Sequence, residues 1–160
     1  MTDPNTGGFV WTPALRAVCY AALRSVRERA GADMAAFFEW LSEDDGLVMR
    51  AQNGWTGNNL VDRLRVKSGD DSLAGYAVSI GEPVIVADLR TETRFRVPAA
   101  LLDQGAITGV AIVVGHPDAP LGVIATHWRR SVNVGDPAVE AIVAIADDLA
   151  VTLSNMDDGG

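Results

Sequence analysis

The stretch Gly69–Phe95, GDDSLAGYAVSIGEPVIVADLRTETRF, predicts a helix, a tight turn, a buried strand and a polar loop in close succession. Asp71 and Ser72 can cap the helix, because side-chain oxygens at that position accept hydrogen bonds from the free N–H groups of its first turn. Apolar residues then recur at helical spacing over the next two turns. Gly81 and Pro83 end the helix, since glycine can adopt the left-handed C-cap conformation and proline cannot continue a helix.

Amphipathic helices are predicted near both ends of the chain. A Thr-Pro pair at 12–13 provides an N-cap followed by proline at the first helical position, and Gly31 closes this first helix. An Asp-Pro pair at 136–137 repeats the signal, with Asp136 as the cap. Apolar residues at helical spacing then extend to Leu153.

Strands are predicted between these two helices. Residues 33–40 and 47–51 flank an acidic turn, and residues 108–114 and 121–128 flank a second turn. Residues 60–66 predict one more short strand. Helices at the ends of the chain with strands between them indicate an α+β fold.

The order of these segments resembles a GAF domain, a small-molecule-sensing regulatory module of bacterial signalling proteins, over roughly Pro13 to Leu153. The resemblance implies a PAS-related central antiparallel sheet. It places the N- and C-terminal helices on one face of the sheet, and short helices with a loop on the other. We expect a single domain over residues 12–155, with flexible tails at 1–11 and 156–160.

Length and charge limit the possible functions. The chain has 160 residues, enough for one domain with a hydrophobic core but not for two ordinary ones. Its net charge of −8 argues against nucleic-acid binding, which needs a basic surface. We find neither a signal peptide nor an apolar stretch near the roughly 20 residues that span a bilayer, so we expect a cytoplasmic protein with no membrane partner. The single cysteine fits a reducing compartment.

The chain shows no recognisable catalytic residue set, metal cluster or phosphate-binding glycine motif, so we expect neither catalysis nor a metal or other cofactor. Cys19 falls on the apolar stripe of the first helix, where a core thiol is the ordinary interpretation. His127 alternates within its strand, so its side chain shares a face with Val123 and Ala125. A half-buried histidine with satisfied hydrogen bonds is the ordinary interpretation there, and a ligand contact is the alternative.

Several activities of the GAF family need residues that this chain lacks. Free methionine-R-sulfoxide reductases need cysteines over their pocket, and no cysteine follows Cys19. Bilin-binding members use a pocket cysteine, and haem-binding members use a histidine of the covering loop, which here spans residues 89–104 without one. We expect no bilin and no haem. The motif common in cyclic-nucleotide-binding members is matched at most by Asp136, so that activity stays open.

The resemblance instead implies a non-catalytic pocket over the sheet, walled by the short helices and the loop. By position in the fold, six residues are candidates for this wall: Phe37, Trp55, Tyr76, Phe95, Leu101 and His127. Core packing competes as an explanation for each of them, above all for Phe37 and Leu101. An aromatic residue in a polar loop, such as Trp55, gains little unless it covers something.

Positive charge is concentrated in the covering loop at Arg90, Arg94 and Arg96. Guanidinium groups match carboxylates and phosphates, so these residues are candidates to bind an anionic ligand. They can equally be surface charges beside Asp88 and Glu92. Both interpretations stay open.

Three functions are compatible with these features. The first is a regulatory sensor that binds a small molecule or a protein partner and signals through its terminal helices, in a two-component or similar pathway. Its broad apolar helix stripes predict a homodimer. The second is a dimerisation or scaffold module whose pocket is filled by its own side chains. A cavity of roughly 300 Å³ or more would distinguish the first from the second. The third, an enzyme on a GAF scaffold, lacks a catalytic set.

Overall fold

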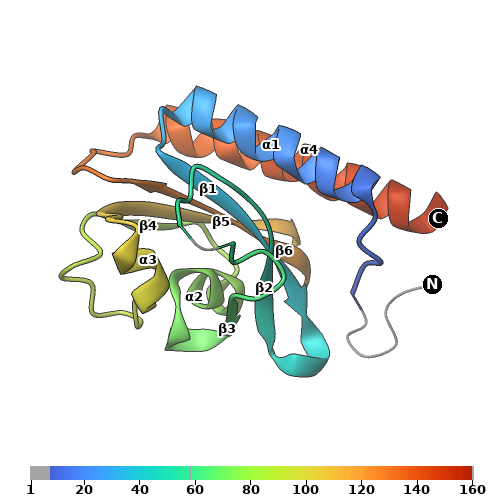
Figure 1. The fold of residues 1–160 in the computed structure, drawn as a ribbon, viewed down its shortest axis with the longest axis horizontal. Helices are drawn as coiled ribbons and strands as arrows, with labels where there is room; N and C mark the ends of the chain where they lie inside the picture. Colours follow the sequence, from blue (N-terminus) through green and yellow to red (C-terminus); the bar gives the residue numbers. More distant parts are fainter. Residues whose placement is uncertain (1–7, 58, 160) are drawn as a thin grey trace.

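A computed structural model describes residues 8–57 and 59–159, and these form a six-stranded antiparallel sheet with helices on both faces (Figure 1). The helices are α1 (Pro13–Ala30), α2 (Leu73–Ile80), α3 (Ala99–Asp103) and α4 (Asp136–Gly159), with short 3-10 turns η1 (Ser42–Asp44) and η2 (Gly69–Asp71). The strands are β1 (Met34–Leu41), β2 (Gly46–Asn53), β3 (Arg65–Lys67), β4 (Val84–Val86), β5 (Thr108–His116) and β6 (Ala119–Trp128). Their order across the sheet is β3-β2-β1-β6-β5-β4.

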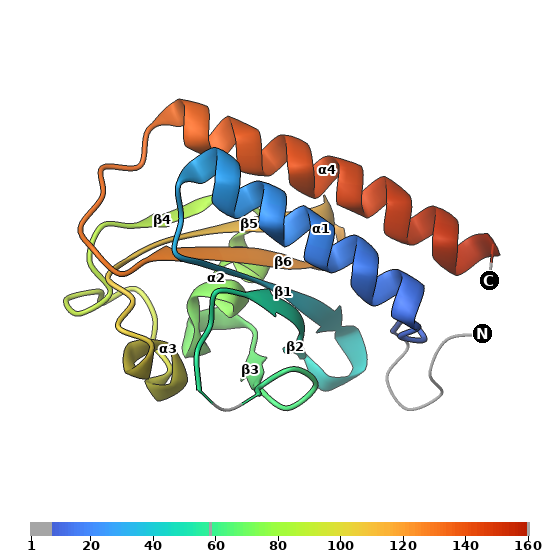
Figure 2. The ribbon, with the colours of Figure 1, turned by 45° about the horizontal axis from the view of Figure 1, so that its top comes forward.

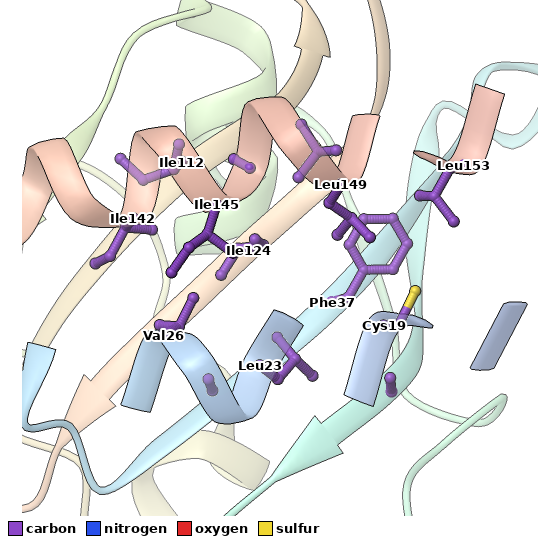
Figure 3. Packing of buried hydrophobic residues seen from close by; sticks show 14 of the residues in the cluster. Cys19, Leu23, Val26, Phe37, Ile112, Ile124, Ile142, Ile145, Leu149 and Leu153 are labelled. Atoms are coloured by element: carbon purple, nitrogen blue, oxygen red, sulfur yellow. The ribbon is translucent and has the colours of Figure 1, made fainter. Parts of the chain in front are cut away.

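The sheet separates two hydrophobic cores. Helices α1 and α4 lie side by side on one face, and Figures 1 and 2 show α2 and α3 on the other. In the first core, Cys19 and Leu23 of α1 pack with Phe37 of β1 and with apolar side chains of α4 (Figure 3). The second core is closed by α2, α3 and the loops. This arrangement confirms the α+β fold predicted from the sequence.

The predicted caps of α1 and α2 are present. The Thr12 hydroxyl oxygen accepts a hydrogen bond from the Leu15 N–H at 3.1 Å, and Gly31 adopts the left-handed conformation with φ 63°. The Ser72 hydroxyl oxygen accepts from the Gly75 N–H at 2.9 Å, and Gly81 ends α2 with φ 69°. Local hydrogen bonds therefore define both helices at the expected residues.

Two predicted boundaries differ from the structure. The strand expected over 60–66 is reduced to β3, because the Leu64 N–H donates to the Leu60 carbonyl at 2.9 Å and closes a turn before it. Asp62 lies in this turn with φ 67°. At the other end of the chain, α4 starts at Asp136 itself and continues to Gly159, so the tail expected over 156–160 is helical as far as the structure describes it.

The expected N-terminal tail over 1–11 is also corrected in part. Residues 1–7 lie outside the described residues, but Phe9 and Trp11 of the segment that follows bind the buried carboxylate of Glu39. Its Oε2 accepts from the Phe9 N–H at 2.7 Å, and its Oε1 accepts from the Trp11 indole at 2.9 Å and from Arg50 Nε at 2.9 Å. The packed domain therefore begins before α1.

The Glu39 carboxylate belongs to a longer chain of ionic contacts. Asp62 accepts from Arg50 at 2.9 Å and from Arg16 of α1 at 2.8 Å. The two guanidinium groups lie 5.6 Å and 5.9 Å from the centre of the Trp11 ring, where cations are attracted to the aromatic face. The N-terminal segment, α1, β1, β2 and the β2–β3 loop are thus joined by charged hydrogen bonds.

Replacing Glu39 tests this junction. Glu39→Ala is expected to lower the free energy of unfolding by about 3 kcal/mol, because it leaves three donors without their buried acceptor. Urea denaturation measures this change. Glu43→Ala, in the exposed turn after β1, is the matched control and is expected to change stability by less than about 0.5 kcal/mol. Equal unfolding midpoints for the two variants would contradict the structural role of Glu39.

Candidate functional site

A small cavity lies in the second core, on the face of the sheet that α1 and α4 do not cover. Its volume is about 30 Å³, room for roughly one water-sized group. Strands β1 and β6, helix α3 and the β2–β3 loop all contribute to its wall, which includes Phe38, Trp55, Leu64, Leu101, Ala125 and His127. Three candidates from the sequence, Trp55, Leu101 and His127, are therefore brought together here.

His127 is positioned by its register on β6. It pairs with Gly109 of β5, and a Cβ atom at residue 109 would lie 2.8 Å from His127 Cδ2 and 3.0 Å from Nε2. Glycine is therefore required at residue 109, because any larger residue would displace the imidazole ring. The ring is also close to Leu73 of α2, since the same Cβ would meet that side chain at 3.3 Å.

The His127 ring is more deeply buried than its sequence context indicates, with only 2% of the residue exposed. Burial lowers its pKa to about 3, so the ring is neutral at pH 7. Neither ring nitrogen has a hydrogen-bond partner among the described residues. The expectation of a half-buried histidine with satisfied hydrogen bonds is therefore wrong, and the unpaired state needs another explanation.

Trp55 covers the cavity from the β2–β3 loop. Its Nε1–H is buried and finds no acceptor in the described part of the chain, while its main-chain N–H donates to Gln52 Oε1 at 3.0 Å. The neighbouring Gly54 and Gly57 have φ values of 95° and 88°. A side chain at Gly54 would collide with the Asp33 carbonyl oxygen, so glycine is needed for the loop to leave β2 in this direction.

Gln104 and Arg129 hold the Trp55 segment in place, and we call this pair the clasp. Gln104 Oε1 accepts from the Thr56 N–H at 2.8 Å, and Gln104 Nε2 donates to the Thr56 carbonyl at 2.6 Å. Arg129 donates to the Gly54 carbonyl at 2.9 Å and to the Gln104 carbonyl at 2.8 Å. Side chains that follow α3 and β6 therefore fix the loop over the cavity.

The loop arginines lie away from the cavity. Arg90 forms a 2.9 Å ion pair with Asp88, and Arg94 forms a 2.7 Å ion pair with Glu92. Arg94 also donates to the Ile85 carbonyl at 2.8 Å. These hydrogen bonds hold the pKa values of both carboxyl groups below their ordinary range. Arg94 and Arg96 also line a separate open hollow of about 240 Å³. Both interpretations left open by the sequence therefore stay predictions.

Phe95 and Tyr76 belong to the second core without lining the cavity. Phe95 is 5% exposed, and its ring centre lies 5.5 Å from that of Tyr76. Phe37 lies on the opposite face, under α1 and α4 (Figure 3), so its placement in the pocket wall is wrong. Its neighbour Phe38 takes that place. Side chains alternate between the two faces along β1, so Phe38 shares a face with Met34 and Ala36, whereas Phe37 faces the other way.

The described residues bear on metal binding, membrane insertion and cysteine reactivity. They contain no group of three or more metal-ligating side chains, and none of their helices is long and apolar enough to cross a bilayer. Cys19 lies in the first core, and burial raises the pKa of its thiol to about 12. The thiolate that nucleophilic chemistry needs is therefore strongly disfavoured at this residue.

Comparison with known proteins identifies the family. The model of the GAF domain family matches residues 14–153. The chain belongs to the GAF domain family. A comparison with curated proteins found no match.

Solved structures share this GAF fold at low sequence identity. The GAF domain of a phosphoenolpyruvate-protein phosphotransferase from Coxiella burnetii is 20% identical, with a TM-score of 0.79 over 90% of this chain and 84% of that one. The chromophore-binding domain of an R. palustris bacteriophytochrome is 18% identical, with a TM-score of 0.70 over 91% and 57%. A type II free methionine-R-sulfoxide reductase from Thermoplasma acidophilum is 17% identical, with a TM-score of 0.69 over 89% and 94%. At these identities the similarity establishes the fold alone.

The pH dependence of stability tests the state of His127 in this GAF domain. Between pH 6.5 and about 3, the unfolded chain binds a proton at His127 and the folded protein does not. The difference in proton binding at His127 is therefore expected to lower the free energy of unfolding by up to about 1.4 kcal/mol for each pH unit of decrease. His127→Gln removes this component, so its urea denaturation curves should show a weaker decrease between pH 7 and pH 5.

Acidic groups titrate in both the unaltered protein and His127→Gln, so their contribution to the pH dependence of stability cancels when the two are compared. The matched control is His116→Gln, because the His116 side chain is 71% exposed. This control is expected to keep the pH dependence of the unaltered protein. Parallel stability profiles for His127→Gln and the unaltered protein would show that the folded state protonates His127 freely.

Proposed function

We propose that this GAF domain is a non-catalytic sensory module that binds a small molecule in the cavity beneath Trp55. The observation that carries the proposal is that Trp55 and His127, two residues that line the cavity, each carry buried polar atoms without a hydrogen-bond partner among the described residues. Buried polar groups in folded proteins are nearly always hydrogen-bonded, because an unsatisfied one costs about 1–3 kcal/mol. A bound molecule with polar atoms of its own would remove that cost.

The cavity must open to accept such a molecule. Its volume of about 30 Å³ is well below the roughly 300–1,000 Å³ of ordinary ligand sites. The geometry of the loop favours opening, since Trp55 lies between Gly54 and Gly57 in the chain and its segment is held largely by the clasp. We therefore regard this structure as the closed state, and a ligand would shift the population towards an open one.

Contacts of the same loop support signalling through the terminal helices. Asp62 lies in the β2–β3 loop with Trp55, and it accepts a 2.8 Å hydrogen bond from Arg16 of α1. Movement of the loop would weaken this contact and its neighbour from Arg50. We therefore propose that opening of the β2–β3 loop is transmitted to the N-terminal end of α1, which carries Arg16. A two-component or similar pathway is the expected context, in the cytoplasm, where a free buried thiol such as Cys19 is stable.

A scaffold function without ligand is the second candidate. The small cavity volume favours it, because the second core is nearly filled by its own side chains. Both candidates predict self-association, but only the sensor predicts a stabilising ligand.

A thermal-shift screen of metabolites and nucleotides separates the two candidates. A ligand present at a hundred times its Kd adds about 2.7 kcal/mol, which raises Tm by roughly 5–10 °C in a domain of this size. We expect at least one such compound. Its effect should persist in Arg90→Ala, which lies outside the cavity, and disappear in Ala125→Leu, which fills it. A screen without any stabilising compound would favour the scaffold.

A homodimer built from α1 and α4 is also part of the proposal. Tyr20 of α1 and Val151 of α4 are 38% and 61% exposed, although both are large apolar residues. Exposed arginines of α1, such as Arg24, complement exposed carboxylates of α4, such as Asp147. These features fit a dimer in which α1 and α4 of one copy pack against α1 and α4 of a second copy.

Light scattering at high micromolar concentration tests the dimer. The expected mass is twice the chain mass of 16.9 kDa. Val151→Asp should shift the mass towards that of the monomer, because a carboxylate would be buried in the interface. Ile85→Asp is the matched control, since Ile85 is 42% exposed on the distant edge strand β4. A monomeric mass for the unaltered protein would remove the dimer from the proposal.

A further inference from the structure

An open hollow is lined by residues of the covering loop and of η2. Its volume is about 240 Å³, and polar atoms form most of its exposed wall. Residues 93–96 of the loop form one part of this wall, and Asp70 and Asp71 of η2 form the other. None of these residues lines the cavity beneath Trp55, so the two spaces are separate. We call this space the charged hollow.

Arg94 lines the charged hollow with a guanidinium group that is fixed in place. Its Nε donates to the Glu92 carboxylate at 3.1 Å, and its Nη2 donates to Glu92 at 2.7 Å and to the Ile85 carbonyl at 2.8 Å. Its Cζ lies 5.9 Å and 6.0 Å from the ring centres of Tyr76 and Phe95. Nη1 has no hydrogen-bond partner among the described residues, so two N–H donors of an immobilised cation remain available.

Arg96 and Asp70 carry opposite charges on the two parts of the wall. Their main chains meet, because the Arg96 N–H donates to the Asp70 carbonyl at 2.7 Å. Their side chains do not pair with each other, and neither has another partner in the part of the chain that the structure describes. Asp71 uses only its Oδ2, which accepts from the Lys67 N–H at 2.9 Å. The charged hollow therefore combines an unpaired cation with an unpaired carboxylate.

A ligand that carries both signs of charge matches these groups. Guanidinium groups bind carboxylates through paired N–H donors, which are available on Arg94 Nη1 and on Arg96. The Asp70 carboxylate can accept from an ammonium group, whose N–H bonds are all donors. A phosphate dianion matches less well, because Asp70 and Asp71 in the same wall would repel it. The volume is just below the roughly 300 Å³ at which ordinary ligand sites begin, so the ligand has to be small.

We propose that the charged hollow binds a small zwitterion of the amino-acid type, with its carboxylate on Arg94 and Arg96 and its ammonium group on Asp70. This site is distinct from the small cavity in the second core, and it does not depend on the opening of that cavity. It uses two of the three loop arginines and leaves Arg90 outside. The bound zwitterion would link the covering loop to η2, the turn that precedes α2.

Matched compounds that lack one charge test the proposal. L-Serine would be compared at neutral pH with ethanolamine, which lacks the carboxylate, and with 3-hydroxypropionate, which lacks the ammonium group. L-Glutamine would be compared in the same way with 4-aminobutanamide and glutaramate, and inorganic phosphate is the last probe. Calorimetric titration of the full chain measures each affinity, and NMR titration of main-chain amides locates the site. We expect at least one of the two amino acids to bind at least about tenfold more tightly than its analogues and phosphate, because each analogue loses one charged contact. The amide signals of residues 70–71 and 93–96 should shift.

Exposed variants assign the two charged contacts. Arg96→Gln and Asp70→Asn should each weaken binding of that amino acid at least about tenfold. Asp70→Asn should also remove its preference over the analogue without an ammonium group. Arg63→Gln and Asp118→Asn are matched controls, because both residues are exposed and lie outside the charged hollow. The controls should leave the affinity and the preference unchanged.

The outcomes separate this inference from the proposed function. Equal binding of both amino acids and their analogues, or an unchanged affinity in either Arg96→Gln or Asp70→Asn, would overturn the inference. Ala125→Leu fills the other cavity and should leave amino-acid binding unchanged. Loss of binding in that variant, with amide shifts around His127, would overturn the inference while supporting the sensor. Absence of binding by both amino acids would overturn the inference alone, since a stabilising compound that needs Ala125 is a separate observation.

Discussion

Alternation of side chains along the central strands is the constraint on which the rest of the structure depends. Helices or loops cover both faces of the sheet, so successive residues of β1 and β6 enter different cores. Phe37 and Phe38 are neighbours in sequence, yet the first packs under the terminal helices and the second lines the cavity. Trp128 and His127 are divided between the faces in the same way. A shift of one residue in register would exchange the two cores.

The two faces differ in what covers them, which explains why the cavity lies on only one of them. Two long helices present continuous apolar stripes to the first face. Short helices and irregular loops cover the second, where Trp55 reaches the core from a loop and His127 lies over Gly109. Trp55 enters this core from an irregular loop, and its buried Nε1 has no partner among the described residues. The regular strand β6 also carries unpaired buried atoms, on His127 at this face and on Trp128 at the other.

The buried carboxylate of Glu39 connects these faces around the edge of the sheet. On the first face it holds Phe9 and Trp11, and through Arg50 it reaches Asp62 in the loop that also carries Trp55. The segment before α1 and the cover of the cavity therefore share one set of ionic hydrogen bonds. Coupling between the cavity and the helix pair needs an element with two arrangements that both sites influence. The β2–β3 loop meets the geometric part of this condition, since it contacts both.

The sequence by itself determined α1, α2, α4 and most of the strands, because caps such as Ser72 and Gly81 act over a few residues. It also indicated Trp55, Leu101 and His127 as wall residues. It did not indicate α3, which lies within the predicted loop at 89–104. Only the tertiary structure decided that Phe38 replaces Phe37, that residues 60–64 form a turn, and that the segment before α1 is packed. It alone showed the clasp, whose Gln104 and Arg129 bond to partners 48 and 75 residues away. Such contacts depend on where distant segments meet in space, and no local periodicity records that.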